Sequence, residues 1–173
     1  MSKLSNIKFI LPVLIVILTS CFSAQLFATA EYDYGADEYI TIAKGLSPDG
    51  SFAITAHKDY GVDNFHLYLT NARTGRRIAT LQEVDPTLDT AAFAFGAIWS
   101  DESSSVTLVW RWSRHNSLKS MTYKISQNGA LPITKKSIDL DIDSKLVDFW
   151  SKNCSGESPT EKRFGTPKNK PEN

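Results

Sequence analysis

The sequence predicts a mainly β protein made of two blade-like antiparallel β-meanders and one short C-terminal helix. Three observations lead to this fold class. Apolar and polar residues alternate with a period of two in several short runs, which is typical of strands that bury one face. Turn-forming residues separate these runs. The succession of runs and turns then occurs a second time, about 54 residues further along the chain.

Residues 1–30 are predicted to be a signal peptide that lies outside the fold. Lys3 and Lys8 precede an uninterrupted apolar run from residue 9 to residue 18, which is shorter than the ~20 residues of a membrane span. Two processing sites compete: Ala28-Thr29-Ala30 fits signal peptidase cleavage, and Leu18-Thr19-Ser20-Cys21 resembles a bacterial lipobox. We therefore expect a periplasmic or secreted protein. An outer-membrane lipoprotein acylated on Cys21 is the alternative, and an uncleaved anchor is a third interpretation.

The first predicted meander covers residues 39–82. A strand at 39–42 leads to the turn Ser47-Pro48-Asp49-Gly50, where Pro48 presets φ and Gly50 accepts a positive φ. Two alternating strands follow, and the turn 71–75 leads into a last strand at 77–81. The residues expected to face the core in the two alternating strands are Phe52, Ile54, Ala56, Phe65, Leu67 and Leu69.

The second predicted meander covers residues 91–138, after a linker at 83–90. Trp99-Ser100 corresponds to Leu46-Ser47, and Gly129 corresponds to Gly75 in a hairpin two residues shorter. A change of two residues preserves the face to which each side chain points. The expected inward residues are Val106, Leu108, Trp110, Met121, Tyr123 and Ile125, whereas His66, Arg111 and Lys124 are expected on the wetter face.

The C-terminal part is predicted to contain one helix and a tail. Asp143 or Ser144 can cap a helix that ends near Asn153, and its apolar stripe is Leu146, Val147, Phe149 and Trp150. The β domain therefore spans 31–153. Residues 154–173 are rich in Pro, Gly, Ser, Lys and Glu and are expected to be disordered. Cys154 is interpreted as a spare thiol of this segment, with an intermolecular disulfide as the alternative.

The first meander resembles one blade of the WD-like β-propellers found in exported bacterial proteins. The motifs that carry the resemblance are the Ser-Pro-Asp-Gly turn, the strand Phe-Ala-Ile-Thr, and the hairpin 67–75 followed by Arg76-Arg77-Ile78. The second copy is degenerate, with Ser-Asp-Glu-Ser at 100–103 and Asn-Gly at 128–129. Propellers need about four to eight blades, so the resemblance implies either a partial propeller or a two-sheet domain. It implies a binding scaffold and transfers no catalytic residues.

Trp112 is the first candidate binding residue. With a period of two, its side chain joins Trp110 and Leu108 on one face, which favours a place in the core. The functional alternative places Trp112 at the end of its strand. There, beside Arg114 and His115, it would form an exposed platform for a sugar or a peptide.

A second candidate group consists of His57, Asp59 and Asp63, with His66 just beyond. A histidine and two carboxylates could bind a metal or transfer protons. Because no metal-binding spacing supports this, a solvated connection between strands is the favoured interpretation, with His57 and Asp59 retained as binding candidates. Calcium at Asp139, Asp141 and Asp143 is disfavoured because the glycine and glutamate of an EF-hand loop are missing. Carboxylates on the wet face of an edge strand explain these three residues better.

Composition and motifs restrict the function classes. Lys and Arg number 19, as do Asp and Glu, so the balance of charge gives no reason to expect a nucleic-acid partner. The sequence has no G-x-S-x-G, P-loop, G-x-G-x-x-G or C-x-x-C motif. We therefore expect a non-catalytic binding or scaffold module of the bacterial envelope, without a cofactor, whose partner is a protein or a glycan. Contact with the membrane is expected only through a lipid on Cys21. The alternatives are a hydrolase using His57, Asp59 and Asp63, with or without a metal ion, and a lipid-anchored structural envelope protein.

Overall fold

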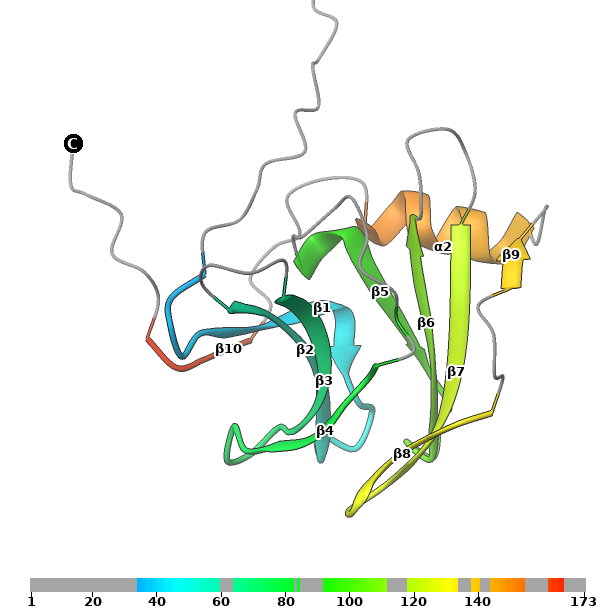
Figure 1. The fold of residues 1–173 in the computed structure, drawn as a ribbon. Coiled ribbons are helices and arrows are strands. Elements are labelled where there is room, and N and C mark those ends of the chain that lie inside the picture. Colours follow the sequence, from blue (N-terminus) through cyan, green and yellow to red (C-terminus); the bar gives the residue numbers. More distant parts are fainter. Residues whose placement is uncertain are drawn as a thin grey trace, which may run out of the picture. The chain divides into compact units, whose positions relative to one another are not determined.

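The computed structural model describes residues 34–59, 64–82, 84, 92–111, 118–133, 138–140, 144–154 and 162–166, all within the unit formed by residues 31–173. The signal-peptide prediction and the loop that contains Asp63 lie outside these residues. The described chain forms a nearly closed mixed β-sheet with one short helix near the C-terminus (Figure 1). The predicted mainly β fold class with a C-terminal helix is confirmed.

Both predicted meanders are present in this sheet. The first consists of β1 (Tyr39–Leu46), β2 (Phe52–Asp59), β3 (Asn64–Asn71) and β4 (Arg77–Thr80), and the second of β5 (Phe95–Trp99), β6 (Ser105–Arg111), β7 (Leu118–Ser126) and β8 (Gly129–Pro132). The strand order is β4-β3-β2-β1-β5-β6-β7-β8. The pairing of β1 with β5 is parallel, with Ala43 opposite Gly96, and the neighbours within each meander are antiparallel. The two meanders therefore share one sheet edge to edge.

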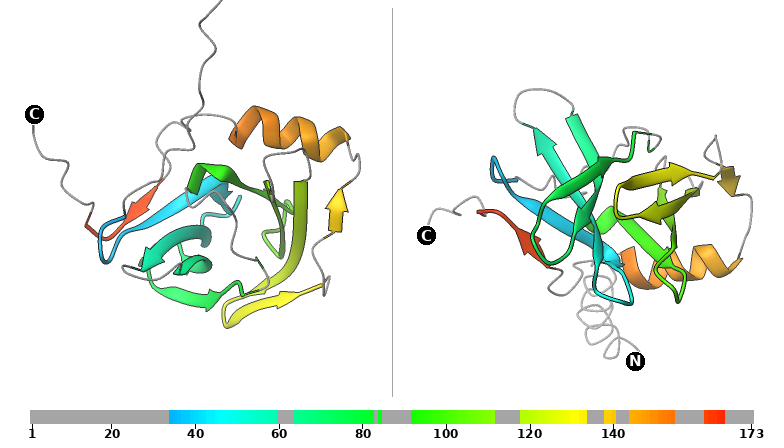
Figure 2. Two further views of the ribbon diagram at one scale, coloured as in Figure 1. Left: turned by 45° about the horizontal axis from the view of Figure 1, so that its top comes forward. Right: turned by 90° about the horizontal axis from the view of Figure 1, so that it is seen from below.

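The topology places four turns at the same end of the sheet. Successive turns of an antiparallel meander alternate between the two ends of its strands, and β1 and β5 run in the same direction. The β1–β2, β3–β4, β5–β6 and β7–β8 turns consequently lie together, at the lower end in Figure 1. The curvature of the sheet also brings β4 into contact with β8, although they are first and last in the strand order (Figure 2).

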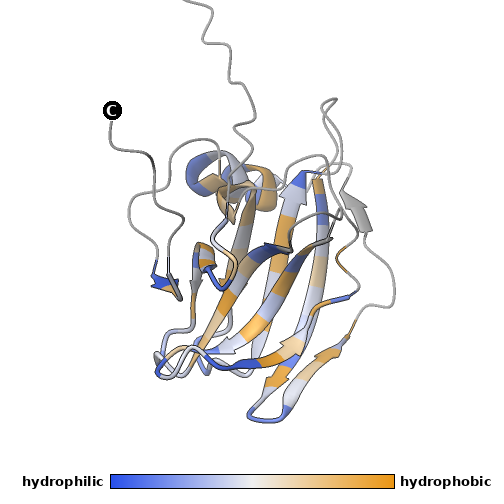
Figure 3. Cartoon of the chain, turned by 60° about the vertical axis from the view of Figure 1, so that its left-hand side comes forward, coloured by the Kyte–Doolittle hydropathy of each residue, from blue (hydrophilic) through white to orange (hydrophobic). Residues whose placement is uncertain are grey.

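The core lies inside the curved sheet, and the predicted inward residues form most of it. All of them belong to the core or pack on it, Phe52 being half-buried and the others buried. Lys124 is exposed, and His66 and Arg111 are half-buried, as predicted for the wetter face. Figure 3 shows the corresponding alternation of apolar and polar positions along the strands. Each fully buried aliphatic side chain stabilises the fold by about 1.5–3 kcal/mol.

The β1–β2 and β5–β6 turns have the same hydrogen bonds. Ser47 N donates to Phe52 O, and Phe52 N donates to Ser47 Oγ. Ser100 and Ser105 make the same two bonds in the second turn. The fourth residue of the turn has a positive φ in both, at Gly50 (68°) and at Ser103 (56°).

The equivalence of the turns shows how the two meanders are related. When the two turns are aligned by these hydrogen bonds, Phe52 of the first corresponds to Ser105 of the second. Phe52 faces the interior, but in β6 the residue that faces the interior is the next one, Val106. The meanders extend from the β1–β5 pair in opposite directions, so equivalent positions after the turns face opposite sides of the sheet. The apolar pattern is therefore displaced by one residue relative to the turns. The resemblance to propeller blades stays a prediction.

The helix α2 (Ser144–Cys154) packs against β5, with which it shares a close approach at Gly96. A Cβ atom on Gly96 would lie 2.7 Å from both Cys154 Sγ and Phe149 Cε1, so only glycine fits there without displacing the helix side chains. Trp150 Nε1 donates to Ala94 O over 3.2 Å, in the short 3₁₀ helix η1 (Ala92–Ala94). The interpretation of Cys154 as a thiol in a disordered segment is wrong, because its side chain is buried at the end of α2.

Two short strands complete the described chain. The β9 strand (Ile138–Leu140) pairs with β7, and β10 (Arg163–Phe164) pairs with β1. The prediction that residues 154–173 are entirely disordered is therefore wrong for 162–166. The backbone of this segment is held by its pairing with β1 and by Thr41, whose N and Oγ1 donate to Lys162 O over 3.0 and 2.5 Å. The side chain of Arg163 adds an ion pair with the buried Glu38. Backbone pairing leaves no mark in amino-acid composition, on which the prediction of disorder depended.

Candidate functional site

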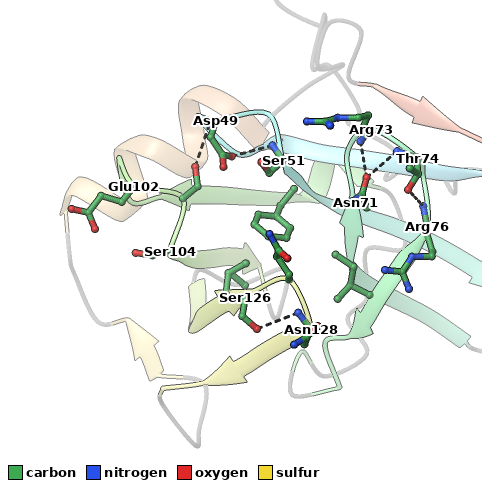
Figure 4. A pocket seen from close by; sticks show the side chains of 15 residues that line it. Asp49, Ser51, Asn71, Arg73, Thr74, Arg76, Glu102, Ser104, Ser126 and Asn128 are labelled. Carbon is green, nitrogen blue, oxygen red and sulfur yellow. Dashed lines mark hydrogen bonds between the residues drawn. The ribbon is translucent and has the colours of Figure 1, made fainter.

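A polar cavity of about 650 Å³ lies at the end of the sheet where the four turns meet, and we call it the mouth cavity. Each of the four turns contributes to its walls (Figure 4). The lining residues are Asp49, Ser51, Phe52, Asn71, Arg73, Thr74, Arg76, Ile78, Glu102, Ser103, Ser104, Ile125, Ser126, Gln127 and Asn128.

Two acidic residues lie on one side of the mouth cavity. The β1–β2 and β5–β6 turns are neighbours because β1 pairs with β5, and Asp49 N donates to Ser103 Oγ over 3.2 Å. Asp49 on the first turn and Glu102 on the second therefore form what we call the acidic wall, which lies at the centre of the strand order.

The carboxylate of Asp49 is held by its own turn. Ser47 Oγ donates to Asp49 Oδ1 over 2.7 Å, and Ser51 N donates to the same atom over 3.0 Å. These hydrogen bonds stabilise the charged form and lower the pKa of Asp49 far below its usual range, against a smaller opposing effect of desolvation. Asp49 consequently remains an anion at the pH values at which proteins are folded, and it is a weak base.

Two arginines lie on the β3–β4 turn and form what we call the basic wall. Asn71 Oδ1 accepts hydrogen bonds from Arg73 N and Thr74 N over 3.0 and 2.9 Å, and Gly75 completes the turn with a φ of 75°. Arg73 and Arg76 are exposed, and neither side chain forms an ion pair with another residue of the described ranges. In Figure 4 these arginines lie across the cavity from Asp49 and Glu102.

The remaining surface of the mouth cavity is uncharged. The β7–β8 turn contributes the hydroxyl of Ser126 and the amides of Gln127 and Asn128. Phe52, Ile78 and Ile125 are the apolar lining residues, and each belongs to the core or packs on it. The site thus combines two charged walls, a hydrogen-bonding wall and an apolar floor.

The predicted candidate His57 lies outside the mouth cavity. It belongs to β2, paired with His66 of β3, and its side chain is buried at 1% exposure. His57 Nδ1 donates to Glu38 O over 2.6 Å, and the imidazole stacks on the Tyr39 ring with centroids 4.3 Å apart. The expectation that His57 lies in a solvated connection is therefore wrong, because β2 continues to Asp59 and the aromatic rings cover this face.

The other predicted site residues lie where the structure gives no side-chain description. These residues are Asp59, Asp63, Trp112, Arg114, His115 and Cys21. Within the ranges that are described, no group of three or more His, Cys, Asp or Glu residues is arranged to hold a metal ion. No helix in the same ranges is long and apolar enough to cross a membrane.

The sequence pattern predicts the turns but does not by itself show the site that they form. The signal was present in the order of the elements: the first and third turns of a meander lie at the same end of its strands. Asp49 and Arg73 could therefore have been placed together from the pattern alone. The parallel β1–β5 pair, which adds Glu102 and Asn128 to the same end, has no comparable signal.

Comparison with protein-family models, with curated proteins and with solved structures finds no match for this chain.

Proposed function

We propose that this protein is an exported, non-catalytic binding module that holds its ligand in the mouth cavity. The convergence of four turns on one polar cavity is the observation that carries the proposal. Its volume falls within the ~300–1,000 Å³ of typical ligand sites, and a few convergent polar groups above an apolar floor are what such sites offer.

The chemistry of the lining supports binding rather than turnover. A general base works best with a pKa near the operating pH, and the hydrogen bonds of its turn move the pKa of Asp49 in the opposite direction. The hydrolase alternative requires an accessible imidazole at His57. That ring is buried, and its Nδ1 is engaged by the backbone carbonyl of Glu38.

The proposed location follows from the first 30 residues. Their basic start, apolar run and competing processing sites favour a periplasmic or secreted protein, or an outer-membrane lipoprotein acylated on Cys21. The proposed partner is a protein or a glycan. The resemblance of the meanders to propeller blades agrees with a role as a scaffold for binding.

A pair of matched variants tests this function. Asn128 is exposed on the β7–β8 turn and lines the mouth cavity, whereas Lys124 is exposed on β7 and does not line it. Asn128→Trp should fill the cavity, and Lys124→Trp should add the same indole elsewhere. Arrays of synthetic peptides and oligosaccharides should retain the wild-type protein and Lys124→Trp but not Asn128→Trp, with equal melting temperatures for all three. Equal retention of Asn128→Trp, or cleavage of the retained ligand, would contradict the proposal.

A further inference from the structure

The two charged walls of the mouth cavity carry equal and opposite formal charge. Asp49 and Glu102 contribute two negative charges, and Arg73 and Arg76 contribute two positive charges. Among the described residues no ion pair joins the two walls, which lie apart across the cavity in Figure 4. A ligand whose charges all have the same sign would be attracted by one wall and repelled by the other.

We infer that the mouth cavity binds a short peptide segment that carries both charges, with a carboxylate on Arg73 and Arg76 and an ammonium group on Asp49 and Glu102. The inference rests on the proposed function and names its ligand class. The cavity volume suits a segment of a few residues.

The basic wall is suited to a carboxylate. A guanidinium group presents parallel N–H donors that match the two oxygens of a carboxylate, and such charge-assisted bonds are among the strongest in proteins. The turn fixes the backbone at Arg73 through Asn71 Oδ1, and Arg76 N donates to Thr74 Oγ1 over 3.3 Å. The arginine stems therefore start from ordered positions, and less conformational freedom is lost on binding.

The acidic wall is suited to an ammonium group. Asp49 Oδ1 is fixed by Ser47 and Ser51, so its carboxylate keeps its orientation before a ligand arrives. The Ser103 hydroxyl, which accepts from Asp49 N, ties the two acidic turns together. A Lys side chain or a free N-terminus would meet the ordered carboxylate of Asp49 and the exposed carboxylate of Glu102 on the same side of the cavity.

The uncharged surfaces favour a peptide over a neutral glycan. Sugar rings are bound well by exposed aromatic faces, and the aromatic residue among the lining side chains, Phe52, is half-buried and packs on the core. A neutral sugar would also leave four charged groups without a counterpart. A peptide can instead hydrogen-bond its amides to Ser126 and Asn128 and place an apolar side chain on Ile78 and Ile125.

Calorimetric titration with four defined probes tests the inference. The probes are end-capped Lys-Ala-Ala-Glu, the same peptide with Gln in place of Lys, the same peptide with Gln in place of both charged residues, and a neutral chito-oligosaccharide. The doubly charged peptide should bind the full-length protein at least about tenfold more tightly than the uncharged one. Arg73→Gln with Arg76→Gln should abolish the preference for the Gln-for-Lys peptide over the uncharged peptide, and Glu102→Gln should weaken only the Lys-bearing peptide.

Arg77→Gln is the matched control, because this exposed arginine lies on β4 outside the lining, over the rings of Tyr39 and Tyr68. It should leave all four affinities unchanged. Equal binding of the doubly charged and the Gln-for-Lys peptides would overturn the inference, because the acidic wall would then play no part. Absence of peptide binding at millimolar concentration would overturn it too. If an oligosaccharide binds and this binding is lost in Asn128→Trp, the peptide assignment is overturned and the proposed binding function stays in place. If Asn128→Trp does not change retention on the arrays, both the peptide assignment and the proposed binding function are contradicted.

Discussion

Thr55 in β2 and Thr70 in β3 form a hydroxyl pair between neighbouring strands of the first meander. Their Oγ1 atoms are 2.8 Å apart, and both side chains are fully buried. Replacing either threonine with valine preserves the shape and the β-branched character of the side chain. It leaves the other hydroxyl buried without this partner.

The expected magnitudes follow from that burial. A buried polar group that loses its hydrogen-bond partner destabilises a protein by about 1–3 kcal/mol, whereas replacing both partners with apolar groups of the same shape is nearly neutral. Thr55→Val and Thr70→Val should therefore each lower the free energy of unfolding by about 1–3 kcal/mol. The double variant should be close to the wild type, and the two effects should be strongly non-additive.

The second meander contains a matched control. Thr107 and Thr122 form the corresponding pair, with Oγ1 atoms 2.9 Å apart, and both residues are only half-buried. A hydroxyl left over at either position can bond to water. Each single valine variant there should lower the free energy of unfolding by less than about 1 kcal/mol.

Urea unfolding followed by fluorescence and circular dichroism measures all five variants. Unchanged m-values show that the unfolding transition itself is the same. Additive losses at Thr55 and Thr70, or losses no larger than those at Thr107 and Thr122, would show that the first pair is not a buried hydrogen bond.

Three further predictions concern the helix contact, the buried histidine and the mouth. Gly96→Ala should lower the free energy of unfolding by about 1–3 kcal/mol through overpacking against Phe149. Gly129→Ala is the control, because a Cβ there meets no atom within 4 Å. It should change the free energy of unfolding by less than about 0.5 kcal/mol in the same denaturant titration. His57→Ala should cost about 1–3 kcal/mol by thermal unfolding because its hydrogen bond and ring stacking are lost; a change within about 0.5 kcal/mol would mean that His57 is solvated. Because the pKa of Asp49 is lowered in the folded protein, its carboxylate stabilises the fold above the ordinary aspartate pKa of about 3.9, and this stabilisation is lost as the pH falls. Denaturant titrations should therefore show that Asp49→Asn loses less stability between about pH 5 and pH 2 than the wild type does. Parallel curves for the two proteins would contradict this prediction.

Most of the sheet could be predicted because its information is local. The period-two alternation through Ile54 and Leu108 identified the buried face in both meanders, and the serine turns identified where strands end. The β1–β5 pairing could not be predicted, because backbone atoms form it where Ala43 lies opposite Gly96, and the side chains of these two residues do not indicate it. The same applies to β10, where the Lys162 carbonyl and not its side chain binds Thr41.

The candidate site was hard to predict for a related reason. His57 is a candidate from the sequence because an imidazole can bind a metal or transfer a proton. In the structure its ring stacks on Tyr39 and is hydrogen-bonded to the Glu38 carbonyl. Asp49 and Arg73 are ordinary turn residues in the sequence and become a site only through the geometry of the whole sheet. Their relevance depends on which turns share an end, and that follows from topology.

The parallel pair of β1 and β5 also orders the events of folding. Hairpin closure between Asp59 and Asn64 joins residues five apart, whereas Ala43 and Gly96 are 53 apart. The longer closure costs about 2 kcal/mol more in chain entropy, so each meander can form from nearby contacts before the two join. Asp49 and Glu102 come from different meanders. The acidic wall therefore exists only after this longer closure, and any ligand that needs both carboxylates binds the protein in which β1 and β5 have paired and stabilises that junction by mass action.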